Sequence, residues 1–371
     1  MKVEDFIDAL NSDFFSGVPD SLLKKLCDAL ISKYGACGRH HIIAANEGNS
    51  IALAAGYHLS TGKVPVVYMQ NSGQGNMINP IASLCNEKVY AIPMYLVIGW
   101  RGEPGVKDEP QHVFQGEITL ELLKVLGIDY FIVSADTELS ELKEWINAKN
   151  DALNHGKQVA FVIKKNSFEG SNKIDYSNKF LLKREEIIKE VIGVSENDLI
   201  VSTTGKASRE LFELRECTDK NHNRDFLTVG SMGHASSIAL EIAMQRPDRR
   251  VWILDGDGAV LMHLGGMAVI GANCPDNLIH IVINNEAHET VGGQPTPVKN
   301  ADLVGVAKSL GYPNAVSVSN LIDLRNELKR AKENKELSFI EVKCAIGSRS
   351  DLGRPTIKAI DNKINFMSEL V

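Results

Sequence analysis

The feature that most constrains the fold is a repeated alternation of short apolar runs with segments of helical periodicity. The first series of runs occupies residues 14–18, 41–46, 64–70, 91–99, 130–134 and 159–164. The second series occupies residues 198–205, 225–230, 251–258, 278–285, 315–319 and 339–345. Runs of this kind separated by helices are typical of parallel sheets that helices cover on both faces. The sequence therefore predicts an α/β protein with two doubly wound, mainly parallel sheets.

A polar stretch separates the two series of runs. The segment "KKNSFEGSNKIDYSNKF", residues 164–180, is rich in Asn, Ser, Lys and Gly, as linkers are. A chain of 371 residues also exceeds one ordinary core and suits two domains. We predict a first domain over residues 1–165, a linker over 166–181 and a second domain over 182–371.

Composition excludes several classes of protein. The net charge is −7 with no basic stripe, which argues against a nucleic-acid partner. The N-terminus is acidic and lacks an apolar signal region, and the longest apolar run, "YAIPMYLVIGW", is too short to span a bilayer. The six scattered cysteines form no Cys-x-x-Cys pair, which favours reduced core thiols. We expect a cytoplasmic protein without a membrane partner.

Two short motifs stand where two neighbouring strands should end. Asp257 lies between two glycines after one apolar run, ahead of a predicted helix over residues 259–272, and Asn285 ends the next run. Ligands of open α/β sheets bind beyond the carboxyl ends of the strands, and helix N-termini suit phosphate. A carboxylate and an amide oxygen there suit Mg²⁺, which fills its remaining positions with phosphate oxygens and water. Each motif alone is as well explained by a plain turn or strand end, but the pair at this spacing favours a magnesium–phosphate site.

The pair also resembles the signature of the thiamine diphosphate enzymes. Residues 256–258 read Gly-Asp-Gly, and after 25 residues Asn-Asn follows at 284–285. The resemblance implies that Mg²⁺ is held against the diphosphate by Asp257, Asn285 and the backbone carbonyl of Ala287. It implies further contacts with the cofactor at Gly205, Ser231, Met232, Gly258 and Ala259. Met232, in "GSMG", would be the apolar wedge that keeps the cofactor bent, although a buried Met is more often core filler.

The same resemblance implies a catalytic glutamate in the other domain. Glu47 follows an early apolar run and precedes an amphipathic helix that should end near Gly62. In the family this carboxyl group hydrogen-bonds the pyrimidine ring and favours the tautomer that activates the cofactor. The alternative for Glu47 is a helix N-terminal acid stabilised by the macrodipole.

The chain lacks the middle domain of most thiamine diphosphate decarboxylases, and this is the plan of the phosphonopyruvate and sulfopyruvate decarboxylase group. Residues 99–112, 202–213, 230–243 and 347–356 resemble the phosphonopyruvate branch of that group. The resemblance implies non-oxidative decarboxylation of 3-phosphonopyruvate to phosphonoacetaldehyde and CO₂ in phosphonate biosynthesis. It also implies a homo-oligomer, because the family binds the cofactor between the first domain of one subunit and the second domain of another.

Candidates for the substrate side come from three loops. The segment "SGVPDSL" resembles a wall of the reaction chamber and offers Asp20 and the candidate catalytic residue Ser21, with helix capping as the alternative. Arginine and lysine side chains suit a dianionic phosphonate, and loops beyond two apolar runs supply Arg101, Lys107, Arg349 and Arg354. The alternative for these cations is pairing with nearby acids in solvated loops. The first loop also carries His112, a candidate catalytic residue.

One departure from the family leaves the proton donor open. Several related decarboxylases place a histidine before the Gly-x-Gly-Asn turn, where this chain has Gln70, Asn71 and Ser72. His112, His288 and the cofactor's own amino group remain as candidates. The competing functions are a sulfopyruvate decarboxylase, a related carboligase and a non-catalytic nucleotide-binding protein. The last is disfavoured because no Gly-x-Gly-x-x-Gly follows the first run.

Overall fold

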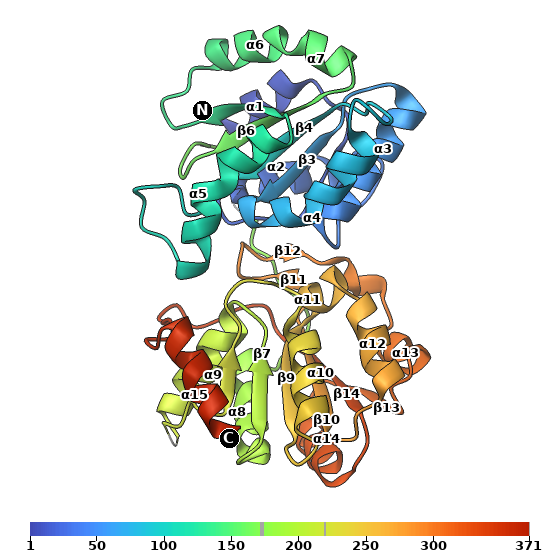
Figure 1. The fold of residues 1–371 in the computed structure, drawn as a ribbon, viewed down its shortest axis with the longest axis vertical. Coiled ribbons are helices and arrows are strands. Elements are labelled where there is room, and N and C mark those ends of the chain that lie inside the picture. Colours follow the sequence, from blue (N-terminus) through green and yellow to red (C-terminus); the bar gives the residue numbers. More distant parts are fainter. Residues whose placement is uncertain (171–173, 219, 371) are drawn as a thin grey trace. The chain divides into compact units, whose positions relative to one another are not determined.

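The structure is a computed structural model that describes residues 1–170, 174–218 and 220–370 (Figure 1). The chain divides into two compact units, and each is described by itself below. The first unit comprises residues 1–175 with 291–295, and the second comprises 176–290 with 296–371. Residues 171–173 of the predicted linker lie outside the described residues. The linker bounds of 166–181 stay a prediction.

The sheet of the first unit has six strands, and every neighbouring pair is parallel. Its strands are β1 (Phe15–Gly17), β2 (His41–Ile43), β3 (Val66–Gln70), β4 (Met94–Gly99), β5 (Asp129–Val133) and β6 (Gln158–Ile163). From edge to edge the order is β2, β1, β3, β4, β6, β5. Strands β4 and β6 are buried along their whole length, as expected for parallel strands covered on both faces.

Helices cover both faces of this first sheet. One hydrophobic cluster joins the sheet to α1 (Val3–Leu10), α2 (Lys24–Tyr34), α6 (Leu139–Ala148) and α7 (Asn150–Asn154). A second cluster joins it to α3 (Glu47–Thr61), α4 (Gln74–Asn79), η2 (Pro80–Cys85) and α5 (Pro110–Val125). Along β3, Tyr68 belongs to the first cluster, whereas Val67 and Met69 belong to the second. The alternation of side chains along a strand thus feeds two separate cores.

The second unit repeats this plan with six parallel strands. Its strands are β7 (Leu199–Ser202), β8 (Asp225–Leu227), β9 (Val251–Gly256), β10 (Leu278–Asn284), β13 (Asn314–Val318) and β14 (Ser338–Lys343). The order is β13, β14, β10, β9, β7, β8. The predicted fold class of two doubly wound α/β sheets is therefore confirmed.

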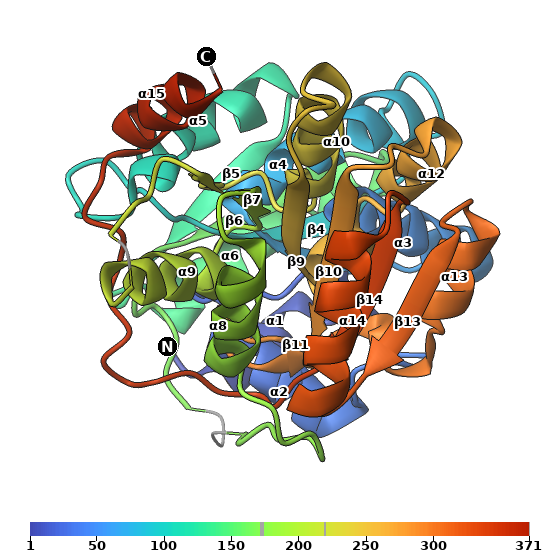
Figure 2. The same cartoon turned by 90° about the horizontal axis from the view of Figure 1, so that it is seen from below.

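Two sets of helices pack on the second sheet. One face carries α8 (Arg184–Ser195), α9 (Lys206–Glu216) and α14 (Leu321–Glu333). The opposite face carries α10 (Ala235–Gln245), α12 (Gly265–Asn273), α13 (Leu303–Ser309) and α15 (Ala359–Glu369). In Figure 2, α8 and α14 lie on one side of β10 and β14, and α10 and α12 lie on the other.

Each predicted apolar run overlaps one strand, but the structure differs from the expectation in three details. Two short strands, β11 (Ala287–His288) and β12 (Gln294–Pro295), are not expected from the sequence. The single helix expected after Asp257 is two helices, α11 (Asp257–Met262) and α12. The break falls at His263, just ahead of a Gly-Gly pair, and glycine lowers helix propensity.

The third difference concerns the cysteines, which are all free thiols. The prediction of core thiols is right for the buried Cys27, Cys85 and Cys344. It is wrong for the exposed Cys37, Cys217 and Cys274. Cys217 and Cys274 follow the last residues of α9 and α12, and Cys37 lies between α2 and β2, where spacing along the sequence carries no signal of burial. Separately, no helix in the described part of the chain combines the length and the hydropathy that a membrane crossing requires.

Candidate active site

Glu47 lies at the carboxyl end of β2 and is the first residue of α3. The helix begins there because the side chain of Asn46 caps it, accepting a hydrogen bond from the backbone N–H of Asn49 at 2.9 Å. The helix ends at Thr61 with Gly62 in the left-handed conformation, as predicted. Glu47 is only 5% exposed, and Asn76 Nδ2 donates to its Oε2 at 2.7 Å. Burial raises the pKa of Glu47, and the bond from Asn76 offsets this only in part.

Two residues that support Glu47 are not identified as site residues by the sequence analysis. A Cβ atom on Gly73 would lie 2.4 Å from Oε1 of Glu47, so any other residue there would displace the carboxyl group. Asn76 supplies the hydrogen bond described above. Both belong to the Gly-x-Gly-Asn turn, for which the only feature noted from the sequence is that no histidine precedes it. The Gly-x-Gly-Asn motif can be found in the sequence, but its contact with Glu47 is apparent only in the structure.

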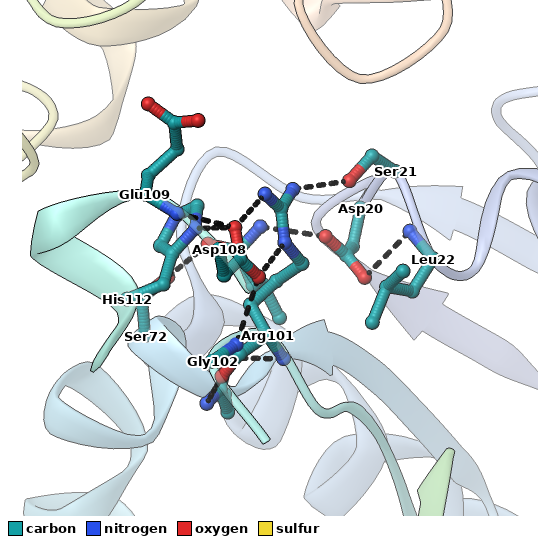
Figure 3. A network of polar contacts seen from close by, with 11 residues as sticks. Asp20, Ser21, Leu22, Ser72, Arg101, Gly102, Asp108, Glu109 and His112 are labelled. Carbon is teal, nitrogen blue, oxygen red and sulfur yellow. Dashed lines mark hydrogen bonds and ion pairs between the residues drawn. The ribbon is translucent and has the colours of Figure 1, made fainter. Parts of the chain in front are cut away.

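Arg101 lies at the centre of a polar network beyond the end of β4 (Figure 3). Asn71 fixes its backbone, since it donates to the carbonyl oxygen of Arg101 at 2.7 Å and accepts from the N–H at 3.2 Å. The guanidinium donates from Nε to Asp108 Oδ2 at 2.8 Å, and its Nη2 also donates to Asp108. Nη1 donates to the hydroxyl of Ser21 at 2.8 Å. The structure thus brings two predicted site residues, Arg101 and Ser21, into direct contact.

Asp108 organises this loop and was not predicted as a site residue. Besides Arg101, it accepts from the backbone N–H of Gly102 and of Glu109 and lies 3.0 Å from His112 Nδ1 (Figure 3). Burial opposes its ionisation, but bonds from Arg101 and His112 hold the pKa of Asp108 well below its usual range. A charged Asp108 accepts from Nδ1–H, which leaves Nε2 as the unprotonated nitrogen of a neutral His112. Burial lowers the pKa of His112, although the bond with Asp108 opposes the shift.

Asp20 lies deeper in the same part of the unit, just beyond β1. It is 0% exposed and accepts from Gln70 Nε2 at 2.6 Å and from the backbone N–H of Leu22 at 3.1 Å. Burial raises the pKa of Asp20 above its usual value. The capping alternative for Asp20 and Ser21 is wrong, since α2 begins at Lys24 and has no side-chain cap. The fifth predicted residue of this region, Lys107, is exposed on the loop before α5.

In the second unit, Asp257 and Asn285 lie at the ends of neighbouring strands. Gly256 of β9 pairs with Ile283 of β10, and a backbone hydrogen bond from Asn285 to Asp257 shows that these two residues are close in space. Both are buried, at 3% and 5% exposure. Thr296 Oγ1 donates to Asp257 at 2.5 Å. Burial raises the pKa of Asp257 to about 7, against hydrogen bonds from Thr296 and from backbone N–H groups.

The residues present fit a divalent cation that also contacts a phosphate. In the described part of the chain, no three His, Cys, Asp or Glu side chains group to hold a metal ion. A cation here would therefore rest on one carboxylate, one amide oxygen and the carbonyl of the buried Ala287. Mg²⁺ accepts such a small protein set because phosphate oxygens and water complete its shell. A buried carboxylate whose pKa burial raises is also one that a cation would stabilise.

Glycines shape the surroundings of this pair. A Cβ atom on Gly258 would lie 3.3 Å from Met232 Cε, from His288 Cε1 and from the Thr296 methyl group, so Gly258 faces a narrow space between them. In the turn that carries Met232, Ser231 takes a positive φ of 46°, which is uncommon outside glycine. Gly205 has a φ of 98°, and a Cβ atom there would lie 2.9 Å from Thr290 Oγ1. The structure thus brings Met232 close to Gly258 at the start of α11, with Ala259 on the first turn of this helix.

His288 and Arg349 differ from what a catalytic or anion-binding role needs. His288 is buried, its Nε2 has no hydrogen-bond partner among the described residues, and burial lowers its pKa to about 4. Arg349 is exposed and paired, as the alternative expects, donating to Glu185 at 2.6 Å, to Asp351 at 3.1 Å and also to Glu213. Arg354 is exposed in the same loop. The structure places both arginines in the second unit, whereas Arg101 and Lys107 are in the first.

Comparison with known proteins identifies both halves of the chain. Residues 3–124 match the thiamine pyrophosphate enzyme N-terminal binding domain, and residues 203–342 match the C-terminal binding domain. Thiamine pyrophosphate is thiamine diphosphate. A phosphonopyruvate decarboxylase of Streptomyces viridochromogenes is 33% identical over 363 residues, which cover 92% of this chain and 87% of the relative. The chain belongs to the phosphonopyruvate decarboxylase family of thiamine diphosphate enzymes. The family that the sequence resembles is therefore confirmed.

Two further relatives of this family span nearly the whole chain. A phosphonopyruvate decarboxylase of Streptomyces hygroscopicus is 30% identical and covers 92% of this chain and 86% of its own length. A sulfopyruvate decarboxylase of Methanosarcina acetivorans is 28% identical, and the match covers 92% of this chain and 90% of the relative. Glu47 and Arg101 lie within the N-terminal match, and Asp257 and Asn285 lie within the C-terminal match. The loop of Arg349 and Arg354 lies outside both.

Proposed function

We propose that the chain decarboxylates 3-phosphonopyruvate to phosphonoacetaldehyde and CO₂, with thiamine diphosphate and Mg²⁺ as cofactors. The observation that carries this proposal is the 33% identity to a phosphonopyruvate decarboxylase across 92% of the chain. The geometry agrees, because one unit holds a buried glutamate and the other holds a buried aspartate beside an amide oxygen. When bound, thiamine diphosphate supplies the electron sink for the bonding electrons that CO₂ leaves behind.

The residues of the chain divide the work between binding and proton handling. Asp257, Asn285 and the carbonyl of Ala287 would hold Mg²⁺, and Met232 would support the bent cofactor. Backbone and small groups at Gly205, Ser231, Gly258 and Ala259 would line the diphosphate end. Glu47 would share a proton with the pyrimidine ring, since a buried carboxyl group with a raised pKa exchanges a proton more readily near neutral pH.

We propose that the substrate side is formed by the Arg101 network. Arg101 keeps N–H groups that Asp108 does not use, and it directs one toward Ser21. Asp20 and His112 lie beside Arg101 (Figure 3), and Lys107 directly precedes Asp108 in the sequence. Arg349 and Arg354 rank second as anion contacts, because Arg349 would have to leave three acidic partners.

We propose a proton donor from the pKa shifts of the candidate groups. Burial lowers the pKa of His288 to about 4, so it is neutral and a poor acid at physiological pH. Burial raises the pKa of Asp20, so this carboxyl group keeps a proton to a higher pH than usual, whereas burial lowers the pKa of His112 and Asp108 holds its Nδ1–H. We therefore favour Asp20 over His288 as the donor, and His112 would accept a proton at Nε2.

We propose a homo-oligomer in which each active site uses the first domain of one subunit and the second domain of another. This proposal rests on the family resemblance of residues 1–165 and 182–371 to the pyrimidine-binding and diphosphate-binding halves. The linker at residues 166–181 would then join halves that serve different sites. Self-association would be required for activity.

A product assay tests the proposed function. The purified protein with thiamine diphosphate and Mg²⁺ is given phosphonopyruvate, sulfopyruvate or pyruvate, and CO₂ and aldehyde are measured for each. We expect phosphonopyruvate to give the highest kcat/KM. Turnover of sulfopyruvate alone would instead support the second candidate, which the 28% identity to a sulfopyruvate decarboxylase favours. An absence of turnover with all three acids would contradict both functions.

A further inference from the structure

The side-chain amide of Asn285 is held between two groups that permit only one orientation. Its Nδ2 donates to Glu289 Oε2 at 2.8 Å, and its Oδ1 accepts from the backbone N–H of Ala287 at 3.0 Å. A carboxylate only accepts and a backbone N–H only donates, so an inverted amide would meet a like partner on both sides. The amide oxygen of Asn285 is thereby fixed by two independent contacts.

Glu289 is itself fixed by donors on all sides. Its side chain is 7% exposed and accepts from Arg184 Nη1 at 2.9 Å, from Lys206 Nζ at 2.9 Å and from Asn285. Every partner in this set donates, so both carboxylate oxygens are used as acceptors. With glutamine at position 289, the side-chain NH2 group would face at least one of these donors instead of an acceptor.

The other end of the network is anchored in the helices of the second unit. Arg184, at the start of α8, donates through Nε and Nη2 to the two carboxylate oxygens of Glu210 on α9, at 2.6 Å each. Glu210 is 1% exposed. Because both helices pack on the sheet, Glu289 is held by rigid elements rather than by its own loop.

We propose that Glu289 is a positioning residue for the metal site, which acts by keeping the amide oxygen of Asn285 available to Mg²⁺. This inference rests on the proposed function, because it takes Asn285 as a metal ligand. A cation needs the oxygen of an amide, whereas an inverted amide would present N–H groups to it. Groups that orient metal ligands from behind are typically responsible for about 10–100-fold in metal affinity.

Glu289→Gln tests the proposal, with Glu210→Gln as the matched control. Both changes remove one negative charge from Arg184, but only Glu289 contacts Asn285. We expect both variants to lower the urea midpoint of the apo protein. In calorimetric titrations with thiamine diphosphate present, Glu289→Gln should weaken Mg²⁺ by about 10–100-fold, and Glu210→Gln should leave it within a few-fold. Equal losses in the two variants would mean that Glu289 only balances the charge of Arg184, which overturns the proposal.

A compensating pair provides a second readout. Asn285→Asp alone sets two carboxylates against each other, so it should weaken Mg²⁺ or destabilise the protein. In the double variant with Glu289→Gln, the amide at position 289 donates to the carboxylate at position 285. The other oxygen of that carboxylate remains available to bind the cation. Mg²⁺ affinity should therefore be higher in the double variant than the two single losses predict. Purely additive losses would contradict the orienting role.

The titrations also separate this inference from the proposed function. If the wild type binds Mg²⁺ with thiamine diphosphate, and Asp257→Asn abolishes this while Glu289→Gln does not, only the role of Glu289 is wrong. If the wild type gives no Mg²⁺-dependent binding at all, the proposed function and this inference fail together.

Discussion

The two units have the same strand order and carry different acids at their strand ends. Numbered within its own unit, each sheet runs second, first, third, fourth, sixth and fifth strand from edge to edge. Each unit also has a buried acid as the first residue of a helix, Glu47 after β2 and Asp257 after β9. Burial raises the pKa of both carboxyl groups. The shared fold thus provides the same physical setting twice.

The neighbours of the two acids differ, and they determine what each acid can do. Glu47 has one amide donor, Asn76, and a space that Gly73 leaves open. Asp257 has the hydroxyl of Thr296 and lies beside Asn285, whose amide oxygen Glu289 keeps in place. The first setting suits sharing a proton, and the second suits holding a cation. Local partners, rather than the fold, therefore separate the two roles.

Glu47→Gln should give the largest effect on activity. The amide keeps the size of the side chain but cannot share a proton with the cofactor, so kcat should fall by about 10²–10⁴-fold. The Kd for thiamine diphosphate should stay within a few-fold, because Glu47 does not belong to the cation-binding unit. Steady-state kinetics and calorimetry measure the two quantities. Near-normal turnover would remove Glu47 from the mechanism.

Asp257→Asn should show the opposite pattern. Loss of the carboxylate should weaken Mg²⁺ and thiamine diphosphate together, by about 100-fold or more, since even outer contacts of a metal are responsible for 10–100-fold. Saturating concentrations of both should restore part of kcat. The same change at the exposed Asp248 is the control. If cofactor affinity were unchanged, the Gly-Asp-Gly motif would be only a turn.

Arg101→Ala and Arg349→Ala compare the basic loops of the two units. If Arg101 binds the phosphonate, its loss should lower kcat/KM for phosphonopyruvate. The expected loss of binding free energy in the transition state is about 2–5 kcal/mol, the range for a desolvated charge pair. Arg349 is exposed and paired with three acids, so its loss should change kcat/KM much less than the loss of Arg101. Pyruvate, which lacks the phosphonate, should respond little to either change. An equal loss with pyruvate would show that Arg101 supports the loop structure instead.

The smallest expected effect is on stability. Burial raises the pKa of Glu47 above its usual 4.5, so its contribution to stability is fully present below pH 4.5. That contribution is lost as the pH rises through the folded-state pKa, because the buried group must then ionise. Apo Glu47→Gln should therefore gain stability relative to the wild type as the pH rises. Urea midpoints at acidic and neutral pH measure this gain, and a difference between the two proteins that does not change with pH would contradict it.

The sequence was sufficient to predict the fold of each unit, whereas the cofactor roles of its strand-end residues stay predictions. Apolar runs set the strands because a buried parallel strand has no polar face, and this signal is local. The positions of Glu47 and Asp257 were predictable because each stands directly after such a run. The break at His263 and the exposed cysteines were not, because they depend on local turn geometry and packing.

The residues that the sequence analysis missed act on partners that are distant in the chain. Asn76 meets Glu47 across 29 positions, and Glu289 meets Arg184 across 105. Asp108 is close to Arg101 in sequence, yet its contacts with four residues are apparent only in the folded loop. A run of charged residues has the same sequence pattern whether its side chains bind a ligand or pair with one another. Residues of this kind can therefore be identified only from the structure.

The central claim is that Glu47 and Asp257 serve one active site although they belong to different units. Mixing Glu47→Gln subunits with Asp257→Asn subunits tests it most directly, after joint refolding or co-expression. In the proposed oligomer, a hybrid pair has one site that receives both intact acids and one that receives neither. We predict that the hybrid regains phosphonopyruvate decarboxylation well above the sum of the two variants. A hybrid no more active than the separate variants would contradict the shared site.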